Sequence, residues 1–222
     1  MRAGQRYSEL QAGVQLANRK GPINEIEYSE FVQKVQDFCD ALGAIPDFPD
    51  MLEVVSRARE LDGFAGDHDA QLAVHLRARR GPWSVPSIQQ HAARHGFVAG
   101  LVPGRLVMPG REDGAPPLLV LSFDSQAALA DTPSQATVRD VTLSFDVPQS
   151  PAGASGDEPF RAWQAAAQAL SLGMDADVVD DRGLPIDSAG FASIGADLGR
   201  LYESLAARDL AAGSTAARRL FA

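Results

Sequence analysis

The sequence has a single cysteine, Cys39, among its 222 residues, so no disulfide can form within the chain. No apolar run reaches the roughly 18–20 residues that a helix needs to cross a bilayer, and we expect no signal peptide after Met1. Basic residues are also fewer than acidic ones: the chain has 20 lysines and arginines and 29 aspartates and glutamates, which gives a net charge of −9. This balance argues against general nucleic-acid binding and against adhesion to anionic lipid, since both partners are negatively charged.

Motifs that carry chemistry are also scarce. No glycine-rich phosphate loop and no nucleophile elbow is present. His91 and His95 have the i, i+4 spacing of a helical metal pair, but no third ligand follows in a recognised pattern, so we interpret them as solvent-exposed. Asp175, Asp177, Asp180 and Asp181 form an acidic cluster, but they lack the glycine and terminal glutamate of a calcium loop. We therefore expect no enzyme activity, no metal and no cofactor.

What the sequence does contain is strict alternation in two stretches, residues 118–124 and 140–148. Because successive side chains of a strand point to opposite faces, each stretch predicts a strand with one buried face. The apolar rows are Leu119, Leu121 and Phe123 in the first strand and Val141, Leu143, Phe145 and Val147 in the second. The opposite rows are Val120, Ser122 and Asp124, then Thr142, Ser144 and Asp146. We place the function on this second face, which lacks the stacking aromatics that an RNA-binding sheet needs.

The remaining patterns predict the fold class. Asn24 and Glu27 form a capping box ahead of an apolar stripe, and we expect this stripe to be core. Its members are Phe31, Val35, Phe38 and Leu42. A second helix follows at about residues 49–61. From residue 70 the order is strand, helix, three strands, helix, strand, helix. This order is typical of an α+β fold of the split β-α-β type, with a mostly antiparallel sheet and helices packed on one face.

We predict three parts. Residues 1–68 form an N-terminal helical extension with a short strand and two helices, residues 69–210 form the sheet domain, and residues 211–222 form a flexible C-terminal tail. Within the sheet domain, Pro103-Gly104 interrupts the stretch 97–108, where we expect a bulge or bend in one strand. Residues 149–157 are a small-residue loop.

From about Asp69 to Asp209 the sequence resembles the C-terminal domain of ZipA, a bacterial division protein that binds the tail of FtsZ. The residues that carry the resemblance are Ser87-Ile88-Gln89-Gln90 with Gly96-Phe97, the 117–124 strand, Val141-Thr142 through Val147-Pro148, and Val178-Val179-Asp180-Asp181. Their order and spacing are specific, although no single motif is. The resemblance implies a six-stranded sheet with helices on one side and no catalytic activity. It also implies a membrane anchor, which we expect to lie outside this chain, and a place on the cytoplasmic face of the inner membrane.

The resemblance further implies that the open sheet face receives the FtsZ C-terminal peptide in a shallow apolar groove. Carried over position by position, the groove consists of Gln71, Ala73, Val102, Leu106, Ser122, Asp124, Thr142, Ser144 and Asp146. In the family, several of these positions hold Met, Ile or Phe, whereas Asp124 and Ser144 are polar here. Each such exchange forfeits about 1.5–3 kcal/mol of apolar burial.

Three explanations of this polar groove stay open. The partner tail is more basic and pairs with Asp124 and Asp146, or the extension 1–68 covers this face, or the alignment is shifted by one residue, which would swap the faces of the strand. We expect a monomeric cell-division adaptor. The alternative is a non-catalytic structural or regulatory module of the same fold that binds another division protein or itself.

Overall fold

The computed structural model describes residues 8–110, 114–132, 134–151 and 158–222. The chain divides into two compact units. The first consists of the residues up to Asp67 together with Arg219–Ala222, and the second of His68–Arg218. Each unit is described by itself. No helix in the described part of the chain is both long and apolar enough to cross a membrane.

The first unit contains a small hairpin and two helices. Strands β1 (Ala17–Asn18) and β2 (Gly21–Pro22) pair antiparallel ahead of α1 (Glu25–Leu42). The predicted capping box is confirmed: the Asn24 side chain accepts from the Glu27 backbone N–H, and the Glu27 carboxylate accepts from the Asn24 N–H. Helix α2 (Met51–His68) runs further than expected, through the stretch that the sequence indicated as a boundary.

The core of the first unit is small. It is built from Ile23, Tyr28, Val54 and Ala58. The Tyr28 hydroxyl donates to the Pro49 carbonyl oxygen at 2.8 Å, which ties α1 to the start of α2. The predicted core stripe of α1 is only partly buried, because Phe38 and Leu42 are 49% and 54% exposed. Only the part of α1 near its N-terminus finds apolar partners in this core.

The second unit is built around a six-stranded sheet. Its strands are β3 (Gln71–Ala78), β5 (Val98–Ala99), β6 (Arg105–Met108), β7 (Leu119–Ser122), β9 (Asp140–Asp146) and β10 (Ala176–Val179). They lie in the order β10-β3-β9-β7-β6-β5, and every neighbouring pair is antiparallel. The predicted α+β class is confirmed. Strands β4 (Trp83–Ser84) and β8 (Thr137–Val138), which were not expected, form a separate pair.

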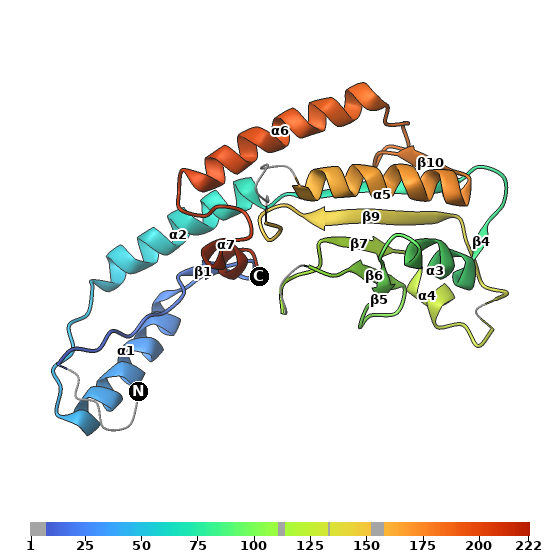
Figure 1. The fold of residues 1–222 in the computed structure, drawn as a ribbon. Helices are drawn as coiled ribbons and strands as arrows, with labels where there is room; N and C mark the ends of the chain where they lie inside the picture. The colour runs from blue at the N-terminus through green and yellow to red at the C-terminus, as the bar shows by residue number, and fades with distance from the viewer. Residues whose placement is uncertain (1–7, 111–113, 133, 152–157) are drawn as a thin grey trace. The chain divides into compact units, whose positions relative to one another are not determined.

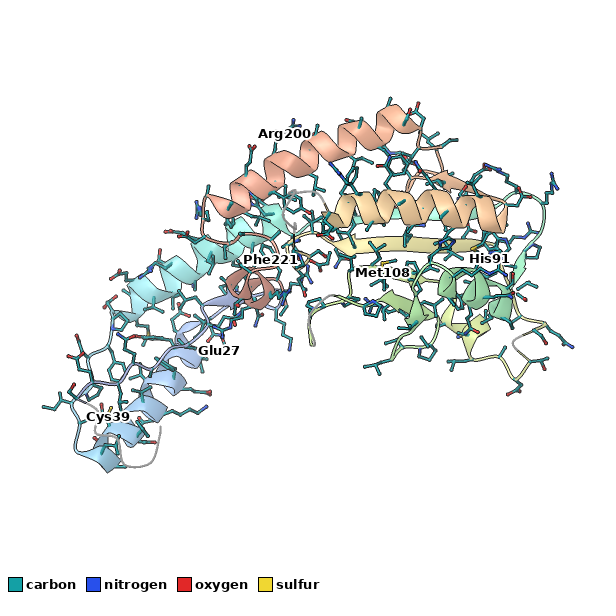
Figure 2. The ribbon with its side chains drawn as sticks, viewed as in Figure 1. Glu27, Cys39, His91, Met108, Arg200 and Phe221 are labelled. Carbon is teal, nitrogen blue, oxygen red and sulfur yellow. The ribbon has the colours of Figure 1, made fainter. Side chains whose placement is uncertain are left out.

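Helices cover one face of this sheet. They are α3 (Val85–Ala93), α4 (Ser125–Ala128), α5 (Glu158–Met174) and α6 (Ser188–Ala206), and all four add side chains to one core with the inward strand residues. Helix α5 runs along β9 (Figure 1). Its Trp163 packs against Phe145 and Phe191 and donates its indole N–H to the Leu143 carbonyl at 3.0 Å. Met108, at the end of β6, packs against the same core (Figure 2).

Two expectations are corrected. Residues 97–108 are not one bent strand, because a tight turn at Gly104 (φ +75°) reverses the chain and makes β5 and β6 an antiparallel pair. Residues 211–222 are not a free tail. The Gly213 N–H donates to the Pro148 carbonyl at 2.8 Å, helix α7 (Thr215–Leu220) follows, and Phe221 is 1% exposed. The predicted 149–157 loop lies mostly outside the described residues.

Candidate functional site

The face of the six-stranded sheet opposite the helices carries an apolar row. The pairing register places one residue of each of five adjacent strands side by side: Ala73, Ser144, Val120, Val107 and Val98. Val98, on the edge strand, is 51% exposed, and the other members are half-buried. We call these five residues the apolar row. Its single hydroxyl is that of Ser144, so the face is more apolar towards β5 than at β9.

A polar row runs beside it. Cα pairing aligns His75, Thr142, Ser122 and Arg105 across β3, β9, β7 and β6. The His75 ring is held at both nitrogens, with Nδ1 3.0 Å from the Thr142 hydroxyl and Nε2 2.9 Å from an Asp181 carboxylate oxygen. These contacts fix the ring against the sheet and join it to the turn that follows β10.

Thr142, His75 and Asp181 follow one another in the order of a nucleophile, a base and an orienting acid, which is the order found in enzymes that transfer acyl groups. Acyl transfer also needs free backbone or side-chain donors aimed at a developing oxyanion. Thr142 lies in the middle of β9, between β3 and β7, where the main-chain groups belong to the sheet ladder. The arrangement is therefore better suited to positioning side chains on the face than to catalysis.

The ends of this face are closed by side-chain pairs. The Gln71 amide donates to Asp146 at 3.3 Å, and the Gln149 backbone N–H donates to the same carboxylate at 3.2 Å. At the other end Arg77 donates to Asp140 at 3.0 Å. The Asp146 carboxylate thus already has partners within the chain, which weakens its role as a receptor for a basic peptide.

Paired charges continue on β10 beyond this end. Arg79 donates to Asp177 at 2.7 Å. This hydrogen bond, followed by the charge of Asp177, raises the pKa of the Arg79 guanidinium, which therefore stays charged at every physiological pH.

A cleft of about 560 Å³ lies where the apolar row reaches the β5–β6 turn. Leu101, Val102, Val107, Pro109, Pro117 and Arg105 are among the residues that line it. We call it the edge cleft. The turn is fixed by two close backbone approaches, since a Cβ on Gly100 would lie 2.8 Å from the Arg105 carbonyl oxygen and one on Gly104 would lie 2.6 Å from that of Phe123. The backbone of this turn is therefore closely packed and has no room for a side chain at either glycine.

The structure brings most of the predicted groove residues to this face. Ala73 and Ser144 lie in the apolar row, Thr142 and Ser122 in the polar row, Gln71 and Asp146 at one end, and Val102 in the edge cleft. The predictions for Leu106 and Asp124 are wrong.

Both errors have a local cause. Leu106 is 5% exposed in the core, because Arg105 and Val107 take the outward positions of β6. Asp124 lies beyond the end of β7, where it caps α4 by accepting the Gln126 N–H at 2.9 Å.

Four contributors were missed: Val98, Val107, Val120 and Arg105. The alternation of residues 118–124 already places Val120 opposite the core residues Leu119 and Leu121. The others needed the β5–β6 turn, because an unbroken strand from 97 to 108 gives no reason to bring Val98 beside Val107. The three missed valines supply most of the apolar surface that the predicted groove lacked.

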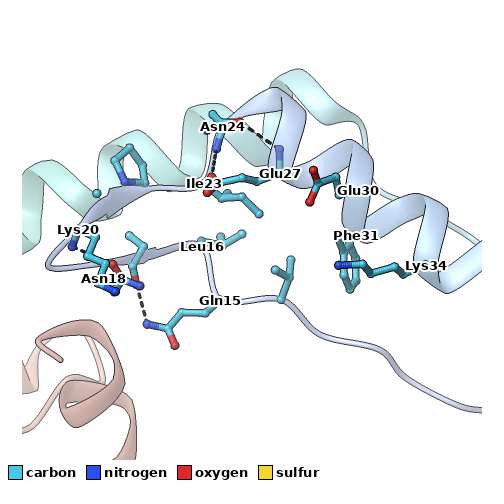
Figure 3. A pocket seen from close by; sticks show the side chains of 14 residues that line it. Gln15, Leu16, Asn18, Lys20, Ile23, Asn24, Glu27, Glu30, Phe31 and Lys34 are labelled. Carbon is cyan, nitrogen blue, oxygen red and sulfur yellow. Dashed lines mark hydrogen bonds between the residues drawn. The ribbon is translucent and has the colours of Figure 1, made fainter.

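A second pocket, of about 510 Å³, lies within the first unit between the β1–β2 segment and α1 (Figure 3). Its lining mixes Lys20 and Lys34 with Glu27 and Glu30 around Phe31. Because Glu27 is already engaged with Asn24, and because charges of both signs are present, this lining selects no ligand class.

Among the described residues, no group of three or more His, Cys, Asp or Glu side chains could hold a metal ion. His91, on α3, lies over α5: a Cβ on Gly173 would be 3.0 Å from its Nδ1 (Figure 2). Comparison of the sequence with protein-family models and with curated proteins found no match.

Proposed function

We propose that this protein is a bacterial cell-division adaptor that binds the C-terminal peptide of FtsZ on the open sheet face, as its resemblance to the ZipA domain implies. The observation that supports this most is the apolar row running across five strands into the edge cleft. A row of this kind suits a short amphipathic segment, because alternate or helical side chains can be buried while the backbone stays solvated at the rim. In the whole protein, the adaptor would tether the division ring to the cytoplasmic face of the inner membrane.

The affinity we expect is modest. Burying one valine-sized side chain contributes about 1.5 kcal/mol, and the apolar row offers three valines and an alanine beside one polar serine. Part of this gain is lost to the ordering of a flexible peptide. We therefore expect a dissociation constant in the micromolar range. No step of this function needs a cofactor, a metal or a catalytic group.

Titration of the protein with a fluorescein-labelled peptide of the FtsZ C-terminus from the same bacterium tests the proposal. Val107→Asn should weaken binding roughly tenfold, because it removes about 1.5 kcal/mol of apolar contact from the middle of the row. Leu172→Asn is the matched control. Leu172 is 84% exposed on α5, the helix that covers the opposite face of the sheet, so its exchange should leave the affinity unchanged.

Absence of binding to the folded wild-type protein at high micromolar peptide would remove the proposal. The alternative would then be a module of this fold that binds another division protein or itself. Equal losses in Val107→Asn and Leu172→Asn would move the site away from the open face.

A further inference from the structure

The geometry points to Arg105 as the receptor, in the edge cleft, for a carboxylate side chain of the bound peptide. This inference rests on the proposed function and adds to it the chemistry of the ligand: an apolar segment that carries an aspartate or glutamate. It is the opposite of one of the three explanations that the sequence left open, in which Asp124 and Asp146 would pair with a basic tail.

The pairing of the arginines on this sheet is the first observation. Arg77 pairs with Asp140 at 3.0 Å, Arg79 with Asp177 at 2.7 Å, and Arg80 contacts Asp175 at 3.5 Å. Arg105 has no ion-pair or hydrogen-bond partner for its guanidinium among the described residues. Of the two arginines that lie within the described strands of this sheet, Arg77 is paired and Arg105 is not.

The position of Arg105 is the second observation. Its backbone is fixed on both sides, because its N–H donates to the Val102 carbonyl at 3.1 Å and its carbonyl oxygen accepts from the Gly100 N–H at 2.9 Å. Among the described residues that line the edge cleft, Arg105 is the one charged side chain. The acidic side chains that could attract a basic peptide are elsewhere: Asp146 is bonded to Gln71 and Gln149, and Asp124 caps α4.

The surroundings favour a carboxylate over other anions. A guanidinium presents parallel N–H donors that match a planar carboxylate, which favours a carboxylate over a spherical anion. The Ser122 hydroxyl, on the residue that pairs with Arg105 across β6 and β7, can donate to the same carboxylate.

The carboxylate comes from a side chain rather than from the end of the peptide. The cleft offers apolar contacts on both sides of Arg105, with Leu101 and Val102 towards the turn and Val107, Pro109 and Pro117 along β6 and beyond. A chain that ended at Arg105 would leave one of these sides uncovered. A chain that passes over Arg105 covers both.

The test uses the full chain and three forms of the FtsZ C-terminal peptide: unmodified, amidated at its C-terminus, and with each acidic residue in turn changed to its amide. Arg105→Met should weaken binding of the unmodified peptide about five- to thirtyfold and flatten the salt dependence of the affinity. Arg105→Lys should recover part of the loss, because it restores the charge without the planar fork. Arg77→Met, which removes the same charge from a residue already paired on this face, should change the affinity less than twofold.

One acid-to-amide peptide should bind wild type as weakly as the unmodified peptide binds Arg105→Met, and should lose nothing more on Arg105→Met. Such non-additivity is the signature of a direct pair. An Arg105→Met loss no larger than that of Arg77→Met overturns the inference, and the proposed function still stands if Val107→Asn weakens binding. If amidation of the peptide C-terminus weakens binding as much as Arg105→Met does, the carboxylate that Arg105 binds is the end of the peptide and not a side chain. No binding of the unmodified peptide to wild type removes the proposed function, and this inference with it.

Discussion

At the scale of single residues, the edge cleft depends on two glycines that have no room for a side chain. Gly104 has a φ of +75°, a conformation that a side chain strains, and a Cβ there would lie 2.6 Å from the Phe123 carbonyl oxygen. Gly100 has an ordinary backbone but the same lack of space, with the Arg105 carbonyl 2.8 Å away. Both contacts are to backbone, which cannot rotate aside, so the turn that presents Arg105 and Val102 tolerates nothing larger at these positions.

Gly104→Ala should therefore destabilise the second unit by about 2–4 kcal/mol, the sum of a strained φ and a forced backbone shift. Gly96→Ala is the matched control. Gly96 has a φ of +84°, but a Cβ there would meet nothing within 4 Å, so this change should cost only about 1 kcal/mol. Urea unfolding followed by the fluorescence of Trp83 and Trp163 measures both. Equal costs would mean that the turn moves to accommodate the methyl group.

At the scale of secondary-structure elements, local sequence signals indicate where a helix begins, whereas packing against distant residues decides which of its side chains are buried. The capping box at Asn24 is readable because all its members lie within four residues. The stripe of α1 is an equally clear pattern, but its prediction as core is wrong in part, because burial needs an apolar partner far away in the chain. Tyr28 has such partners in Val54 and Ala58, whereas Phe38 and Leu42 are about half exposed.

Asn24→Ala should reduce the stability of the first unit by about 1 kcal/mol, because the N–H groups of Ile26 and Glu27 lose their acceptor. Ser29→Ala, in the same helix, removes only a side-chain bond to the Glu25 carbonyl and should change the stability by less than about 0.5 kcal/mol. Amide hydrogen exchange along residues 25–42 measures the stability of α1 in both variants. A similar response to the two changes would argue that the cap does not limit opening of α1.

At the scale of the whole molecule, the chain does not keep its two units in sequence order. Residues 219–222 belong to the first unit, where the Gln15 side-chain amide donates to the Arg219 carbonyl at 2.6 Å. The segment before them belongs to the second unit, where Gly213 is bonded to Pro148. Residues 211–222, which the sequence predicts to be a flexible tail, thus make ordered contacts within both units.

Phe221→Ala should destabilise the protein by about 3–5 kcal/mol, since the ring is almost fully buried, and residues 219–222 belong to the first unit. Removal of Ala222, which is exposed, is the control and should have no effect. Hydrogen exchange resolved by residue should show lost protection in residues 8–67 for Phe221→Ala. Unchanged protection would mean that the C-terminal residues add nothing to the stability of that unit.

The α+β class, the strands β7 and β9 and the Asn24 cap could be predicted from the sequence, because alternation and capping act between residues close in the chain. Which outward residues meet could not be predicted, because this depends on how the strands pair. The β5–β6 turn brings Val98 beside Val107 and sets Arg105 in an apolar cleft, while the end of β7 turns Asp124 away to cap α4. A face shared by five strands is defined by the hydrogen-bond register between segments far apart in the sequence. A single tight turn, which two glycines make possible, is enough to change which side chains lie on that face.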